Sequence, residues 1–296
     1  MLIGTKLVGT ESKKIDLIDG SKAYSKLSKI ISEEGVLKRD YIYYTSLSII
    51  AFGGFFLSLF LIIVANSLYS IVLFSSIFAF FSVQVAGLIH DCGHRAIFKS
   101  SKYNDYFGHI CAAVVAIPYT NWKIRHNKHH ASPNEEDADP DINFPFISFT
   151  TERYRRKEGL EKILSKYQAY IYFPILTLTV FIERNIIFLF SKESRKNLGT
   201  WEKTFFLVGV FTWFILPFVI FDPAKAIAFS LTSNMLTGFY IANIFAPNHK
   251  GMPEIKKGAE ISFIEQQIMT TRNIKANWFV DFVYLGLNYQ MEHHLF

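Results

Sequence analysis

The residues with the clearest chemical potential are histidines gathered in three short motifs. The first motif is a pair four residues apart, the second holds three histidines within five residues, and the third ends in two consecutive histidines. One more histidine follows Asn248. The eight candidate metal ligands are His90, His94, His126, His129, His130, His249, His293 and His294. Helical residues three or four apart share a face, whereas consecutive residues point about 100° apart, so one helix could serve two adjacent metal centres.

The number of histidines sets a limit on the kind of centre. Imidazole suits zinc, copper, iron and nickel, so the residue type alone does not choose the metal. A zinc ion takes four protein ligands in structural sites and three in catalytic sites. Eight histidines are too many for one tetrahedral ion and enough for two metals. The ninth histidine, His109, lies in an apolar stretch, and we expect it to be an ordinary core residue.

Polar residues near these motifs could orient the ligands. A metal-bound imidazole usually donates its other N–H group to a carboxylate, a carbonyl or water. Asp91 could do this, or could cap a helix end instead. Gln290 shares a helical face with His293, where it could hold a metal-bound water or simply pack. The candidates for this outer role are Asp91, Asp139, Asp141, Asn248, Gln290 and Glu292.

The composition indicates a membrane protein. Half of the 296 residues are hydrophobic, 17% are aromatic, and phenylalanine alone contributes 30. Such an excess is typical of chains that face lipid. The net charge of +6 fits lysines and arginines beside a membrane, since there is no basic stripe or motif for nucleic acid. Cys92 and Cys111 form no CxxC pattern, and we expect reduced thiols.

Four apolar segments have the roughly 20 residues that a membrane-spanning helix needs. Short turns at Asn66 and Asp222 join them into two hairpins. A further apolar stretch at 108–119 is too short to cross, and one at 170–190 contains Glu183 and Arg184, so we expect it to be interfacial. Residues 1–40 are expected to form a cytoplasmic tail without a signal peptide, and 41–296 one membrane domain. The predicted spans are 45–65, 68–88, 204–221 and 227–246.

The predicted topology brings all eight histidines to one face. An even number of crossings separates every motif from every other. Clusters of lysine and arginine at 22–39, 95–102, 153–166, 191–203 and 250–257 lie on that same face, which is cytoplasmic by the positive-inside rule. The sequence therefore predicts an all-α integral membrane protein with four transmembrane helices in two hairpins and a cytoplasmic helical cap that carries the histidines.

These motifs resemble those of the membrane fatty acid desaturase family. The chain contains HxxxH at 90–94, HxxHH at 126–130 and QxxHH at 290–294, in order and with comparable spacing, and the resemblance extends from about residue 45 to the end. The glutamine of the third motif resembles the front-end branch and related acyl-lipid or acyl-CoA desaturases. The resemblance implies two non-haem iron ions that activate O2 and a cis double bond introduced into a fatty acyl chain.

Two departures from the family pattern affect these expectations. Family members usually continue beyond the third motif, whereas this chain ends at Phe296, so a C-terminal tail is expected to be short or missing. Many front-end enzymes carry a fused cytochrome b5 domain with His-Pro-Gly-Gly, which does not occur here. The resemblance then implies a separate electron donor, either a ferredoxin or a cytochrome b5 with its reductase.

Other functions remain open on the sequence alone. A hydroxylase on the same di-iron frame differs only after the first hydrogen is removed, and a zinc-dependent membrane receptor or hydrolase would use histidines too. A proton-relay transporter fits poorly, because its polar groups should lie inside the spans rather than at their ends. Trp122, Lys123 and Arg125 could contact an anionic head group or the electron donor, or could be interfacial anchors.

Overall fold

The computed structural model describes residues 19–143, 146–181 and 196–296. In this part of the chain, helices are joined by turns and loops. It contains no strand, only one isolated bridge between Glu135 and Ile255. A π-helical turn, Phe211–Ile215, joins α11 to α12. The helices are α1 (Gly20–Glu33), α2 (Tyr41–Val64), α3 (Leu68–Gly93), α4 (Ser101–Val114), α5 (Tyr119–Ala131), α6 (Thr151–Arg156), α7 (Gly159–Lys166), α8 (Gln168–Phe181), α11 (Thr200–Val210), α12 (Leu216–Ile220), α13 (Pro223–His249), α14 (Phe263–Thr270), α15 (Trp278–Val283) and α16 (Gln290–Leu295).

Among the described residues, three helical segments are long and apolar enough to cross a membrane. They are α2, α3 and the continuous run from α11 to α12. Only 22% of the apolar window of α2 is buried in the protein, so most of its side chains face outward. A hairpin joins α2 to α3, and Ser67 begins α3 with a capping box in which Ser67 and Ser70 exchange hydrogen bonds. These three segments agree with three of the four predicted spans.

The fourth predicted span corresponds to α13, which is 27 residues long but is not among the helices of sufficient apolarity. Its sequence carries hydroxyl and amide side chains that bond back to the helix itself, as from Ser233 Oγ to the Phe229 carbonyl, at 2.7 Å. The helix packs along α3 and α8. At its start, Lys225 Nζ donates to the carbonyls of Ile63 and Ala65, at 2.9 and 3.0 Å, which joins the two hairpin turns.

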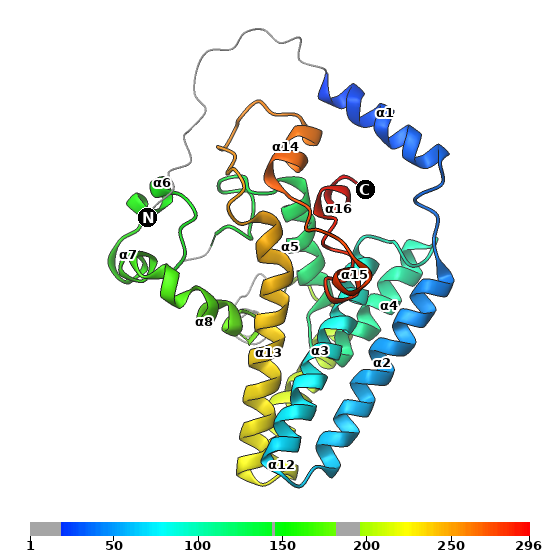
Figure 1. Ribbon diagram of the computed structural model, residues 1–296, viewed down its shortest axis with the longest axis vertical. Coiled ribbons are helices and arrows are strands. Elements are labelled where there is room, and N and C mark those ends of the chain that lie inside the picture. Colours follow the sequence, from blue (N-terminus) through cyan, green and yellow to red (C-terminus); the bar gives the residue numbers. More distant parts are fainter. Residues whose placement is uncertain (1–18, 144–145, 182–195) are drawn as a thin grey trace.

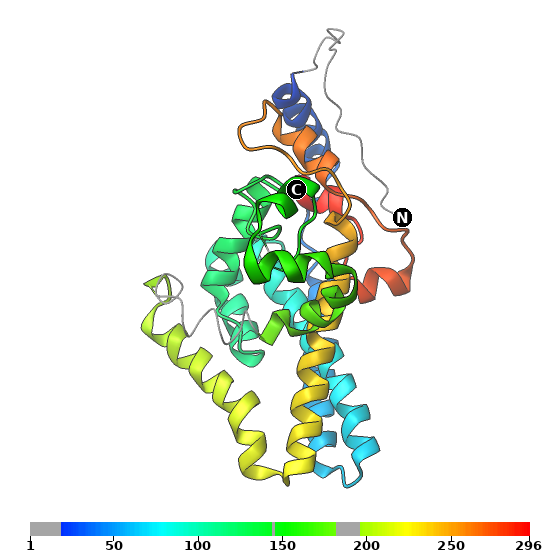
Figure 2. The same ribbon diagram turned by 90° about the vertical axis from the view of Figure 1, so that its left-hand side faces the viewer.

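The remaining helices gather at the upper end of α3 and α13 in Figure 1. There, α5 and α16 lie beside the ends of both long helices, while α11 leans away from α13 in Figure 2. The segment predicted as a tail contains α1, which contacts α14. The hydroxyl of Tyr24 in α1 donates to the Leu295 carbonyl at the end of α16, at 2.8 Å. The predicted interfacial segment is helical through Phe181 as α8, and Glu183 and Arg184 lie outside the described residues.

Candidate metal centre

The eight predicted histidines come together from four helices and form two adjoining clusters. We call the first the five-histidine cluster and the second the three-histidine cluster. In each, the members offer ring nitrogens that lie within 4.8 Å of one another. The rings of His130 and His294 stack between the clusters, with centroids 4.1 Å apart. The five-histidine cluster contains His90, His94, His126, His130 and His293, and the three-histidine cluster contains His129, His249 and His294.

The five-histidine cluster is built where α3 ends beside α5 and α16. The Nε2 atoms of His94 and His126 are 2.7 Å apart, and those of His90 and His293 are 3.2 Å apart. The Nδ1 atom of His90 lies 3.1 Å from the Asp91 carboxylate, so this nitrogen carries the proton and Nε2 has a free lone pair. The buried Nε2 of His130 has no hydrogen-bond partner among the described residues.

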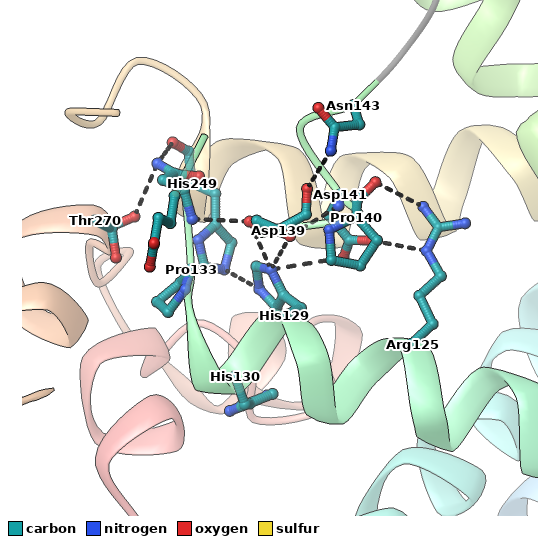
Figure 3. Close-up of polar contacts among 12 residues, drawn as sticks. Arg125, His129, His130, Pro133, Asp139, Pro140, Asp141, Asn143, His249 and Thr270 are labelled. Atoms are coloured by element: carbon teal, nitrogen blue, oxygen red, sulfur yellow. Dashed lines mark hydrogen bonds and ion pairs between the residues drawn. The ribbon is translucent and has the colours of Figure 1, made fainter. Parts of the chain in front are cut away.

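In the three-histidine cluster, as at His90, Nδ1 of a ring faces an outer partner and Nε2 faces another histidine. His129 directs Nδ1 at both oxygens of Asp139, at 3.0 Å each, and His294 directs Nδ1 at Gln267 Oε1, at 2.9 Å. Both rings therefore present a bare Nε2 to His249, at 3.4 and 3.2 Å. Figure 3 shows His129 directed at the Asp139 loop and His130 directed away from it, as two consecutive helical residues must be.

Hydrogen bonds of two side-chain amides determine whether Nε2 of His249 carries a proton. Asn248 donates from Nδ2 to the Leu287 carbonyl, at 2.7 Å, and to Gln290 Oε1, at 2.9 Å. The NH2 group of Gln290 must then face His249 Nε2, which is 2.9 Å away. Because a donor faces it, His249 Nε2 carries no proton. Three bare nitrogens therefore converge in the three-histidine cluster.

Burial keeps most of these imidazoles neutral. It lowers the pKa of His94 to about 3, with the charge of His90 adding to the effect. Burial, with neighbouring histidines, also places the pKa values of His126, His130, His293 and His294 well below the ordinary value. Burial acts on His129 in the same direction, but the Asp139 hydrogen bond and the charges of Asp141 and Asp139 outweigh it and raise the pKa.

The donor sets fit metal ions. Facing lone pairs of neutral imidazoles repel each other unless a proton or cation lies between them. Two nitrogens bound to one metal at about 2.1 Å lie roughly 3.0–3.4 Å apart at octahedral or tetrahedral angles. The facing Nε2 pairs are 2.7–3.4 Å apart. Metal binding requires neutral imidazoles, and burial favours the neutral form of the histidines whose pKa it lowers.

Three of the six predicted outer partners contact a histidine directly, and a fourth acts through one of these three. Asp91, Asp139 and Gln290 contact ligand candidates directly, and Asn248 acts through Gln290. Asp141 bonds mainly to Arg125, at 2.9 Å, and lies 3.8 Å from His129. Glu292 in α16 is exposed, and its carboxylate accepts a hydrogen bond from Asn273, at 2.7 Å, so its role as an outer partner stays a prediction. His109 belongs to neither cluster, and both cysteines are free and buried, as predicted.

Two further residues were not predicted from the sequence. Gln267 of α14 is fully buried and accepts from His294. Asn134 donates from its backbone to Asp139, at 2.8 Å, and from its side chain to the His249 carbonyl, at 3.3 Å. Neither residue lies in a histidine motif. The only sequence signal near Gln267 is the capping box Ser262–Glu265, which predicts the helix and not the contact.

A cavity of about 190 Å³ adjoins both clusters between α5, α8 and α13. His126, His129 and His249 form part of its wall, and Arg125 and Lys250 add positive charge. Most of the remaining wall is apolar. Of the three contact candidates from the sequence, Trp122 and Arg125 line this cavity, whereas Lys123 bonds to Asp105. Its uncharged lining includes Trp122, Ile147, Phe149, Tyr172, Gly238, Ile241, Ala242, Phe245 and Ala246.

The helical fold of the described residues and the two histidine clusters, which could hold metal ions, fit a membrane-associated metal-binding protein, and comparison with known proteins specifies the family. The model of the fatty acid desaturase family matches residues 66–296, and the chain belongs to this family. It is 28% identical to the Delta(5) fatty acid desaturase fat-4 of Caenorhabditis elegans, over 72% of this chain and 51% of that protein. The identity is 28% to the Delta(6)-fatty-acid desaturase fat-3 of the same organism, over 93% of this chain and 65% of that protein.

A relative named for another lipid class matches with similar identity. The chain is 27% identical to a Delta 8-(E)-sphingolipid desaturase of Emericella nidulans, over 94% of this chain and 54% of that protein. The chain spans between half and two thirds of the length of these curated relatives. The family prediction from the histidine motifs is confirmed.

Proposed function

We propose that this chain is an O2-dependent di-iron desaturase that introduces a cis double bond into a fatty acyl chain. One observation carries the proposal: two clusters of histidines adjoin each other beside a largely apolar cavity. Family membership supports the same conclusion. The relatives are named for fatty acid or sphingolipid desaturation.

The proposed reaction needs redox metals because an unactivated methylene offers no handle for acid–base chemistry. The five-histidine cluster would hold one iron and the three-histidine cluster the other. When bound, the irons supply the oxidising chemistry, as cofactors generally do. Two adjacent methylenes lose one hydrogen each. The four electrons that reduce O2 to two waters come in equal parts from the substrate and an external donor, and two protons are taken up.

The residues of the chain would bind the substrate and fix the ligands. Apolar side chains of the cavity favour the acyl chain by about 0.8 kcal/mol per buried CH2 group. Asp139, Gln267 and Asp91 hold the Nδ1 protons of their histidines, which keeps each Nε2 directed inward. Trp122 stacks on His126, with centroids 4.7 Å apart, and both side chains line the cavity.

We further propose that α13 is a fourth membrane span and that the histidine-bearing end of the bundle is cytoplasmic. The upper ends of α3 and α13 both deliver histidines, and both hairpin turns lie at the opposite end (Figure 1). Lysines and arginines are concentrated on the histidine side. A reporter placed at Asn66 that proved cytoplasmic would contradict this orientation.

The partners follow from the chemistry of the reaction. The substrate would be a fatty acyl chain carried as an acyl-lipid or acyl-CoA, entering from membrane lipid or from the cytoplasmic face. A separate ferredoxin, or a cytochrome b5 with its reductase, would supply electrons. Arg125 and Lys250 at the cavity wall are the candidates for contact with the carrier's polar group.

The test is expression in a host without polyunsaturated lipids, followed by double-bond mapping of its lipids by mass spectrometry. The parent protein should give products lighter by two hydrogens, whereas His129→Ala should give none and should still insert in the membrane. Asn127→Ala, at an exposed position of the same helix, is the matched control and should keep activity. Products heavier by one oxygen would indicate a hydroxylase. Purified protein with zinc and no iron would contradict the di-iron centre.

A further inference from the structure

Helix α5 carries three of the eight histidines, yet its own sequence leaves the start of the helix without a side-chain cap. The N-cap residue is Pro118, which has no side-chain acceptor. The first N–H groups of any helix have no partner within the helix. The start of α5 is partly buried, with Tyr119 only 1% exposed, so access of water cannot satisfy these groups freely.

A carboxylate from a distant helix satisfies this position. Glu202 of α11 accepts a hydrogen bond from Thr120 N, at 2.8 Å, and another from Thr120 Oγ1, at 2.7 Å. Glu202 is only 5% exposed, although it lies 82 positions further along the chain. A negative charge at a helix N-terminus is also favoured by the helix dipole.

Residues of α4 also contact Glu202 and the first turn of α5. His109 of α4 places Nδ1 3.9 Å from Glu202 Oε1, and its ring packs edge-on against Tyr119 and Trp201. Asp105, also of α4, accepts from the Tyr119 hydroxyl at 3.1 Å. The first turn of α5 is therefore held from α4 and α11 together, outside both histidine clusters.

We propose that Glu202 is a positioning residue that caps α5 in trans and thereby fixes the direction in which the second histidine motif faces both clusters. The role rests on the proposed function, because it gives the α5 histidines their metals. Small rotations of a helix start are transmitted along its axis, and His126 lies less than two turns beyond Thr120. Glu202 touches no candidate ligand and acts only through the helix.

Hydrogen–deuterium exchange of metal-free, full-length protein in detergent tests the cap. Glu202→Ala should speed exchange of the amides from Tyr119 to Ala131 by roughly five-fold, the equivalent of one lost N-cap. Glu202→Gln keeps one acceptor oxygen and should show a smaller increase. Glu161→Ala removes an exposed carboxylate from α7 and should leave exchange in α5 unchanged. Unchanged exchange in Glu202→Ala would overturn the cap.

A second measurement tests the effect on the metal site. In cobalt(II)-loaded protein, Glu202→Ala should shift the visible absorption bands and lower metal content, with partial recovery in Glu202→Gln. Altered exchange with parent-like bands and metal content would overturn the positioning role. Parent protein that takes up no metal would instead refute the proposed function, while the exchange comparison would still decide whether Glu202 caps α5.

Discussion

Replacement of Asp139 tests the role of the outer partners that orient the histidines. Its carboxylate is fully buried, and each oxygen accepts two hydrogen bonds. Both oxygens accept from His129 Nδ1, at 3.0 Å, and they accept separately from the backbone N–H groups of Asn134 and Asp141, at 2.8 Å each (Figure 3). Replacement by asparagine keeps the shape and leaves only one acceptor oxygen.

The expected cost follows from this geometry. Whichever way the new amide turns, its NH2 group faces a backbone N–H at the position where an oxygen now accepts. One buried donor then loses its partner, which costs about 1–3 kcal/mol. This cost falls on the folded protein whether or not metal is bound. Metal binding is affected separately, because His129 loses the carboxylate that holds its Nδ1 proton, and replacement of such an outer partner typically lowers metal affinity 10–100-fold. We therefore expect Asp139→Asn to weaken metal binding at the three-histidine cluster by 10–100-fold.

The assay is iron content at a series of buffered iron concentrations, together with product formation in the expression host. Asp137→Asn is the matched control, because Asp137 lies in the same loop with a side chain that is 61% exposed. Its positive φ of 64° is one that asparagine tolerates. Parent-like iron affinity in Asp139→Asn would refute the assignment of Asp139 as the partner that orients His129.

Three further predictions concern packing, the cavity and the metals. Gly93→Ala would place a Cβ atom 2.8 Å from Trp122 Cζ3, and this overpacking should lower the free energy of unfolding by about 1–3 kcal/mol, as measured by thermal unfolding. Gly53→Ala, where a Cβ atom would meet nothing within 4 Å, should leave the free energy of unfolding unchanged. Ala242→Phe should fill the cavity and remove the products of the longest acyl chains, as measured by lipid analysis, whereas Leu236→Phe, at an exposed position of the same helix, should not. Iron at 100 times its dissociation constant should raise the unfolding free energy by about 2.7 kcal/mol, and a midpoint unchanged by chelation would contradict a bound metal.

The sequence predicted those helices that can be recognised from the length and apolarity of a single segment. Apolar segments of spanning length predicted α2, α3 and the α11–α12 run. The fourth predicted span corresponds to α13, which contains more polar side chains than the other three and is therefore less apolar. Some of these side chains bond to carbonyl groups of the same helix. The contact of α1 with the C-terminal helix was not predictable, because the two segments are joined by a hydrogen bond between residues 271 positions apart.

By itself, the sequence determined which residues could bind metal. It also determined that two consecutive histidines of a helix would point in different directions. His129 and His130 face different clusters because each helical residue turns the side chain by about 100°. Only the tertiary structure decided which histidines share a cluster and which groups hold their protons. Gln267 and Glu202 come from other helices, and Glu292 points outward despite lying inside a motif. The physical reason is that ligand identity is local, whereas the direction of a side chain depends on how its helix is rotated and capped by its neighbours.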